Sequence, residues 1–418
     1  MTTFQRAFGR MLGGAALLAS VGCNDFLTVE NPNVIDVSAI DPVKDATTLA
    51  NSVQQNYAVA LGWSVMYSSW FNGESIVAET FPTRNEFGRR DTNEANGSLA
   101  ADVWAPISLA AASSKIVLDL KLPNETTNIN YARAALWRGF SFVLMAQDFC
   151  RGTVNSGPAL TTGQMLDSAV VHFSRTIAVG TANGSADARA LANAALVGRA
   201  RAHLQAGRGA QASADAAGVP TGFLFTLPFV DNLAQRTRLG NRFWQFTLDR
   251  GSIGVSEVFR VRPDTRVRYK TPTEHTLAPQ DASTGAFFIQ DKFPAFNSPV
   301  RVASKLEAEY ISAEVAGTAS QLAIVQARRA ASGVAVYAGA TDAASVLKEF
   351  LWQKSLDFYL EGQRQGDFRR QPAAMTGIPI AGTAYFKPGF PSIRRQYAAL
   401  VLPVTSSLSD LTRVFGRR

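Results

Sequence analysis

Between Tyr131 and Ala217, apolar residues recur at three- and four-residue steps in three consecutive runs. This spacing places each run on one face of a helix, so the stretch predicts three amphipathic helices that must cover one another. Alanine and glycine dominate the third run, and because small residues let helix axes approach closely, we expect this helix to lie between neighbours. The apolar positions are Ala132, Ala135, Leu136, Gly139, Phe140, Val143 and Ala146; Leu166, Ala169, Val170, Phe173 and Ile177; and Leu191, Ala194, Ala195, Gly198 and Ala202.

The connections between these predicted helices, Gly180–Ser185 and Gly207–Gly209, are short. Short connections make consecutive helices antiparallel neighbours, and a series of such hairpins is typical of a tetratricopeptide-like stack. An ordinary α-helical domain without repeats is the alternative. Further helices are expected at about Ala46–Leu61, Trp104–Leu122, Lys305–Ala316, Ala319–Ser332 and Ser345–Gly362.

The helical pattern is interrupted after Gly218 by about eighty residues rich in proline and glycine. Few helices fit such a stretch, and strands are expected at Phe243–Phe246, Arg260–Tyr269 and Gly285–Ile289. The sequence therefore predicts a mainly α fold, with a tetratricopeptide-like helical-hairpin scaffold at 45–217 and 303–370, a long irregular, partly β insertion at 218–302, and a loop region at 371–418.

The segment Trp63–Gly97 loses the helical period and collects aromatic, arginine and amide side chains. Aromatic faces stack on sugar rings while arginine and asparagine bind hydroxyl groups, so this segment is predicted to be a loop that captures a glycan or peptide. If it folds over the same edge as the insertion, its residues face aromatic residues of the insertion across a shallow site. Aromatic residues of a loop can instead cap a core. The candidate ligand-binding residues are Trp70, Arg84, Arg90, Asn96, Trp244 and Tyr269.

The N-terminus carries Arg6 and Arg10, then a short apolar segment, Met11–Val21, and then Cys23. The apolar segment is too short to span a bilayer and suits a cleaved export signal at 1–22, followed by a single domain at 23–418. The residues before Cys23 resemble a bacterial lipobox, although Ser20 stands where leucine is usual, so Cys23 is the predicted lipidation site. Ordinary secretion with an incidental cysteine is the alternative.

The net charge and the motifs of the chain argue against several classes of function. The chain has 418 residues and a formal net charge of +8, without a basic block, which argues against a nucleic-acid partner. Its three histidines show no metal-ligand spacing, no G-x-S-x-G or H-E-x-x-H motif occurs, and we expect neither cofactor, metal nor catalysis. Glycosidase carboxylates need no fixed spacing, so an exported hydrolase stays open. Cys150, in an apolar stretch, is expected to be buried.

Several separated segments resemble, in order, the SusD/RagB family of outer-membrane nutrient-binding lipoproteins. The last segments are the most specific: Leu360-Glu361-Gly362-Gln363-Arg364 with Asp367-Phe368-Arg369-Arg370 is similar to the family's "ELxxEGxRxxDLRR" helix end, and Leu402-Pro403-Val404 resembles its "LPIP". The earlier segments are Cys23–Leu27, Ala132–Phe149, Leu306–Glu314 and Leu322–Gly333.

This resemblance implies a SusD-like fold and a non-enzymatic lipoprotein held on the exterior of the outer membrane by its lipid anchor. It implies that the protein captures a glycan or peptide and passes it to a TonB-dependent, SusC-like transporter, which would dock on the scaffold side. A polysaccharide hydrolase and a pure tetratricopeptide interaction scaffold are the alternatives. The charged residues of the helix end, Glu361, Arg364, Asp367 and Arg369, are expected to lock the terminal loop onto the scaffold.

Overall fold

The structure is a computed structural model that describes residues 40–394. The chain divides into two units, Met1–Asp41 and Pro42–Arg418, and the second carries all the elements below. The predicted signal peptide, Cys23 and the motif Leu402-Pro403-Val404 lie outside the described residues, so their assignments stay predictions.

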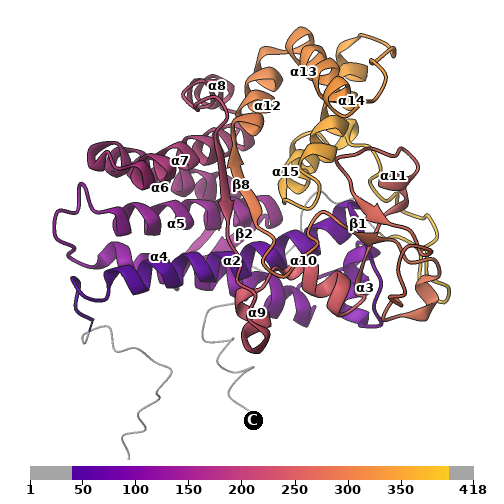
Figure 1. The fold of residues 1–418 in the computed structure, drawn as a ribbon, viewed down its shortest axis with the longest axis horizontal. Helices are drawn as coiled ribbons and strands as arrows, with labels where there is room; N and C mark the ends of the chain where they lie inside the picture. The colour runs from indigo at the N-terminus through magenta and orange to yellow at the C-terminus, as the bar shows by residue number, and fades with distance from the viewer. Residues whose placement is uncertain (1–39, 395–418) are drawn as a thin grey trace, which may run out of the picture. The chain divides into compact units, whose positions relative to one another are not determined.

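Helices of the first half pack on one another in chain order, α2 on α4, α4 on α5, α5 on α6, α6 on α7 and α7 on α8 (Figure 1). The 99–119 stretch is apolar enough to cross a membrane by composition, but it packs against both α2 and α5, as a core helix does. The mainly α fold class is thus confirmed. The helices are α2 (Ala46–Asn72), α3 (Pro82–Gly88), α4 (Ala105–Asp119, preceded by a π-helical turn at Leu99–Trp104), α5 (Ile129–Asp148), α6 (Thr162–Asn183), α7 (Ala186–Gln205) and α8 (Gly209–Ala217).

The small-residue face of α7 lies against α6, as the sequence predicts. The ring of Phe173 on α6 is fully buried between Gly139 on α5 and Gly198 on α7. A Cβ atom added at Gly198 would lie 2.5 Å from Phe173 Cζ, and one added at Gly139 would lie 2.7 Å from Phe173 Cε1. Glycine at these two positions therefore lets three helices share one phenyl ring.

The second helical part continues the packing from α8 to α12, α13 and α14, and α15 returns to contact α2 and α5. A buried ion pair fixes the junction: Arg201 on α7 donates to both carboxylate oxygens of Glu307 on α12, at 2.5 and 2.7 Å. The helices are α12 (Lys305–Ala316), α13 (Thr318–Ala331), α14 (Ala343–Asp357) and α15 (Gln363–Arg370).

The insertion leaves and re-enters the scaffold through one antiparallel strand pair, in which Leu227 lies opposite Val300. A second pair joins the scaffold to the insertion, with Ser75 opposite Val255. The strands are β1 (Ser75–Val77), β2 (Arg151–Thr153), β3 (Ala159–Thr161), β4 (Leu224–Leu227), β5 (Ile253–Val255), β6 (Tyr269–Lys270), β7 (Ile289–Gln290) and β8 (Val300–Ser304), and the short helices are α9 (Arg236–Leu239), α10 (Arg242–Trp244) and α11 (Glu257–Arg260). The pairs are β1–β5, β2–β3, β4–β8 and β6–β7.

Four local predictions are wrong. The segment Arg260–Tyr269 is the end of α11 followed by a loop, and of its residues only Tyr269 lies in a strand, β6. Helix α2 continues to Asn72, where Gly73 ends it at φ +79°, so Trp63–Asn72 is helix rather than loop. The segment Phe243–Phe246 is helical instead of a strand, because the Asn241 side chain caps the backbone N–H of Trp244. Cys150 is exposed, because α5 has already ended at Asp148 and the chain turns outward toward β2.

Of the four charged residues expected to lock the terminal loop, Arg364 does so. Glu361 instead pairs with Lys292 and Arg301 of the insertion, and Arg369 donates to the carbonyls of Ala146 and Phe149 at the end of α5. Arg364 donates to the carbonyl of Asn72 at the end of α2, to Ser355 Oγ on α14, and to the carbonyl of Thr376 beyond α15. Asp367 accepts a hydrogen bond from Lys354 Nζ at 2.8 Å. The bonds of Arg364 hold the start of the segment 376–394 on the scaffold, while the Asp367–Lys354 pair joins α15 to α14.

Candidate functional site

An open cavity of about 600 Å³ lies where the insertion meets the turn after α13. Its volume falls within the roughly 300–1,000 Å³ typical of small-ligand sites. One wall is the loop between α11 and β6, and the opposite wall is the turn at 332–334. We call it the Tyr269 groove; its lining residues are Pro263, Asp264, Thr265, Val267, Arg268, Tyr269, Asp291, Ser332, Gly333 and Val334.

The loop wall of the Tyr269 groove is rigidly held. Arg266 donates to both oxygens of Asp264, at 2.8 and 2.7 Å, and its guanidinium also lies 3.2 Å from Asp357 on α14. Burial by itself raises the pKa of Asp264, but the hydrogen bonds from Arg266 outweigh burial and hold that pKa below its usual value. Thr265 Oγ1 bonds to the carbonyl of Ser332, which ties the loop to the opposite wall.

The chemistry of the Tyr269 groove comes from three neighbouring side chains. Tyr269 is half-buried, with its ring edge-on to Phe288 at 6.1 Å between centroids. Arg268 is exposed and donates to the carbonyl of Lys292, and Asp291 pairs with Lys270 at 3.5 Å. An aromatic face beside a guanidinium and a carboxylate suits a polyhydroxylated ligand, because the ring covers C–H groups while the polar groups bind hydroxyls.

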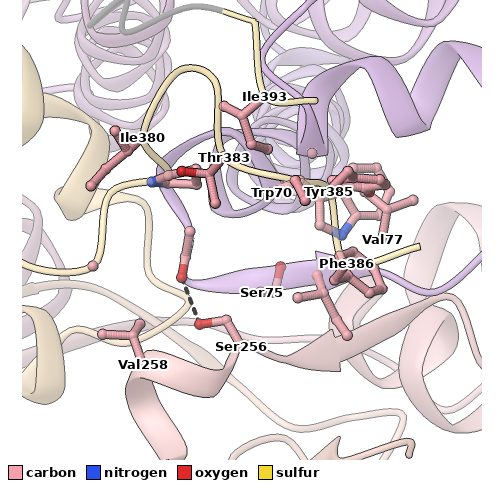
Figure 2. Close-up of a pocket in the computed structure, with 16 residues that line it drawn as sticks. Trp70, Ser75, Val77, Ser256, Val258, Ile380, Thr383, Tyr385, Phe386 and Ile393 are labelled. Carbon is pink, nitrogen blue, oxygen red and sulfur yellow. Dashed lines mark hydrogen bonds between the residues drawn. The ribbon is translucent and has the colours of Figure 1, made fainter. Parts of the chain in front are cut away.

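A second cavity, of about 210 Å³, lies between the end of α2, β1, the start of α11 and the segment 377–393 (Figure 2). Its lining is mostly apolar and includes Trp70. A third cavity, of about 480 Å³, lies on the other side of Gly377 and Ile380 and is lined by Lys348, Phe368 and residues 372–380.

Two of the predicted ligand residues are held in buried polar networks near α3. Arg84 donates to both oxygens of Glu79 at 3.0 Å, to Tyr67 Oη at 2.8 Å and to Asp102 at 3.2 Å. Asn96 donates to Glu86 and to the carbonyl of Thr83. Both side chains therefore hold the α3 region together.

Trp70 and Arg90 are also inside the protein, each 1% exposed. The Arg90 guanidinium lies between the rings of Phe71 and Phe368, at 4.8 and 4.7 Å, and donates to the carbonyl of Pro379. Trp244 packs on Phe296, with ring centroids 4.8 Å apart, and lines none of the three cavities.

The six residues thus do not face one another across one site. Trp70 lines the second cavity, Tyr269 lines its own groove, and the other four line none of the three. The expectation that Trp70 is exposed is wrong, because α2 carries it into the core. The candidates Arg268 and Asp291 were missed, although the alternation of apolar and basic residues in Arg260–Tyr269 is a signal that could have found Arg268.

Metal ligands in the described residues would be groups of His, Cys, Asp and Glu side chains, and His172 lies on α6 in the helical scaffold. Within 40–394, no group of three or more His, Cys, Asp and Glu side chains could hold a metal ion. His172 stacks on Phe142 and receives Arg138 Nε at 3.0 Å, and burial together with Arg138 lowers the pKa of His172 to about 3. This imidazole serves packing and hydrogen bonding.

Comparison with solved structures defines the class of fold. The chain resembles a SusD/RagB family protein from Bacteroides thetaiotaomicron with a TM-score of 0.62 and 13% identity, over 83% of this chain and 92% of that one. A SusD-like carbohydrate binding protein from Bacteroides vulgatus gives a TM-score of 0.61 and 14% identity, over 82% and 85% of the two chains. A SusD superfamily protein from the same organism gives 0.59 and 14%, over 89% and 97%.

These matches show that the chain has the SusD-like fold, which confirms at the level of structure the resemblance seen in the sequence. No protein-family profile and no curated protein sequence matches the chain.

Proposed function

We propose that the protein is a non-enzymatic, SusD-like binding protein that captures a glycan in the Tyr269 groove. The observation that carries the proposal is the half-buried Tyr269 ring beside Arg268 and Asp291 in an open cavity of about 600 Å³. One protein that shares the fold is described as carbohydrate binding. The mixed charge of the groove suits a neutral glycan, and an extended peptide is the competing ligand.

We further propose that the protein is a lipoprotein on the exterior of the outer membrane and hands its ligand to a TonB-dependent transporter. Support for the anchor is the sequence ending at Cys23, and support for the transporter comes from the family resemblance. One face of α4 is available for a partner, because Leu109 and Ile116 lie two helical turns apart and are 56% and 38% exposed.

The glycan proposal is tested by titrating a panel of neutral oligosaccharides against the purified protein and three variants. Tyr269→Ala removes the stacking face and should weaken binding several-fold, since aromatic stacking contributes on the order of 1 kcal/mol. Tyr269→Phe keeps the ring and should bind nearly as well as the wild type. Trp244→Ala removes a ring outside the groove and should leave affinity unchanged.

Two results would overturn the assignment of the site. Unchanged affinity in Tyr269→Ala would move the glycan site elsewhere, and loss of affinity in Trp244→Ala would restore the site expected from the sequence. Binding of extended peptides in place of every oligosaccharide would assign the groove to the competing ligand.

A further inference from the structure

One face of α14 connects the two walls of the Tyr269 groove, which come from distant parts of the chain. Glu349, Gln353 and Asp357 recur every four residues along α14, so they lie in a row on one face of the helix. Gln353 and Asp357 are buried, and Glu349 is partly buried. We call this row the α14 stripe. Polar side chains inside a protein need hydrogen-bond partners, and here the partners come from both walls of the groove.

The first connection between the walls runs through Asp357. Arg328, in the last turn of α13, donates to both carboxylate oxygens of Asp357, at 2.9 and 2.7 Å. Arg266, in the loop wall, has its guanidinium 3.2 Å from the same carboxylate. Tyr310 on α12 also donates to this carboxylate, at 2.6 Å, so it is held from three sides. Asp357 thus ties the loop wall to the end of α13.

The second connection runs through the other two members of the stripe. Arg266 donates to Gln353 Oε1 at 2.6 Å, and Gln353 Nε2 donates to Glu349 at 2.9 Å. Glu349 also accepts a hydrogen bond from Arg329 at 2.7 Å, and Arg329 donates to the carbonyl of Ala335, just beyond the turn wall, at 2.6 Å. An unbroken chain of hydrogen bonds therefore runs from the loop wall across α14 to the turn wall.

The turn wall follows any movement of the end of α13. The backbone N–H of Ser332 donates to the carbonyl of Arg328 at 3.2 Å, and that of Val334 donates to the carbonyl of Arg329 at 2.9 Å. The two arginines that contact the stripe therefore also carry the turn. Support of the helices alone would need partners from α12 and α13 only, whereas Arg266 brings the loop of the groove into both connections.

We infer that the α14 stripe positions the Tyr269 groove: it holds the two walls at a fixed separation, so that the groove receives its ligand without closing around it. The inference rests on the proposed function for the identity of the ligand, whereas the fixed separation is a property of the protein alone. A preformed site loses less conformational entropy when it binds. Loosening either connection populates wider forms of the groove, and the apparent affinity falls with the fraction of molecules that keep the competent separation.

The separation of the walls is measured with a pair of spin labels on the purified full-length protein. The labels are attached through Pro263→Cys on the loop wall and Ala335→Cys beyond the turn wall, both at exposed positions, after Cys23 and Cys150 have been replaced by alanine. Electron paramagnetic resonance then gives the distribution of distances between the labels. With the stripe intact, this distribution should be narrow.

Arg328→Gln cuts the first connection and should broaden the distribution, whereas Arg328→Lys keeps a charged donor and should restore most of its narrowness. The matched control is Arg199→Gln. Arg199 on α7 donates to both oxygens of Asp215 at 2.8 and 2.6 Å, nearly the geometry of Arg328 with Asp357, but far from the groove in the fold of the scaffold. Its loss should leave the distribution narrow. Gln353→Met cuts the second connection without removing a charge, so it serves where melting curves show that Arg328→Gln does not fold.

Binding is measured with the oligosaccharide of the neutral panel that the wild type binds most tightly. Its affinity should fall about 3- to 10-fold in Arg328→Gln, which corresponds to a competent fraction of roughly a tenth to a third, and should stay unchanged in Arg199→Gln. The label distances in the wild type should be the same with and without this oligosaccharide.

Three results would overturn the inference: distributions as narrow in Arg328→Gln and Gln353→Met as in the wild type, equal broadening in Arg199→Gln, or label distances that shorten when the oligosaccharide binds. A wild type that binds no oligosaccharide of the panel would refute glycan capture instead. The label distances of the unliganded variants then still decide whether the α14 stripe sets the separation of the walls.

Discussion

Phe173 of α6 and Gly198 of α7 are in such close contact that a single methyl group at position 198 would lie 2.5 Å from the phenyl ring. The same ring also covers Gly139 on α5, so the two glycines and one phenylalanine set the spacing of three successive helices. The closeness of the scaffold helices therefore depends on the absence of two side chains.

Gly198→Ala should lower the free energy of unfolding by about 1–2 kcal/mol. Overpacking costs about 1–3 kcal/mol, and the better helix propensity of alanine returns up to about 1 kcal/mol. Urea denaturation measures the difference. Gly163→Ala is the control, because a Cβ atom there meets nothing within 4 Å, and it should lose no stability. If Gly198→Ala were as stable as Gly163→Ala, the Phe173 ring would have to move aside at no cost in free energy.

Asp148→Asn should remove part of the pH dependence of stability. Asp148 accepts a hydrogen bond from Ser64 at a fully buried position, and burial raises its pKa to about 7. The folded state thus keeps a proton that the unfolded state has lost, so stability falls as the pH rises from about 4 to 7. The penalty above pH 7 reaches roughly 4 kcal/mol for a shift of about three units.

The measurement is the free energy of unfolding at a series of pH values for the wild type, Asp148→Asn and Glu125→Gln, whose side chain is exposed. Glu74, buried and with its pKa raised to about 7 mainly by desolvation, contributes in the same direction, so the Asp148→Asn slope should be reduced and not abolished. If the free energy of unfolding of Asp148→Asn changed with pH as steeply as that of Glu125→Gln, then Asp148 would be ionised in the folded state at low pH.

Cys23→Ala should release the protein from the membrane fraction of the cells that produce it, because a lipid anchor needs this thiol. Cys150→Ala is the matched control: Cys150 is exposed in the described part of the chain, and its replacement should leave the protein in the membrane fraction. Cell fractionation with immunodetection provides the measurement. Retention of Cys23→Ala at the wild-type level would disprove the lipid anchor.

Leu109→Asp with Ile116→Asp should reduce co-purification with the proposed transporter, since a carboxylate placed in an apolar interface loses its hydration. Val336→Asp changes a residue that is 68% exposed, in the loop after α13, and should leave co-purification intact. Quantitative pull-down from solubilised outer membranes compares the variants. An undiminished transporter signal in the double variant would place the interface on another face.

The elements that the sequence predicted well are those whose signal is local. Three- and four-residue spacing alone predicts the helix Lys305–Ala316. It also predicts the three helices built on the apolar runs around Phe140, Phe173 and Gly198. The end of α2 was missed because Trp63–Asn72 carries polar and aromatic residues on faces that are all covered by other elements, which removes the amphipathic pattern.

The site was harder to predict because its residues gain their roles from distant partners. Arg84 has the composition of a ligand residue, yet Glu79 and Asp102 use its donors within the fold. Tyr269 was identified, whereas Asp291 enters the groove only through the pairing of β6 with β7, and no local signal marks that register.

The segment that covers the Trp70 cavity is among the last parts of the described chain to be synthesised, while the residues it covers are among the first. Arg90 and its acceptor Pro379 are separated by 289 positions. A nascent chain released or cleaved before Thr376 can build the helices up to α15, but its cavity would lack one wall. A molecule clipped before Thr376 therefore lacks this wall while its helices stay similar in content, so the integrity of the cavity reports whether residues 377–393 are present.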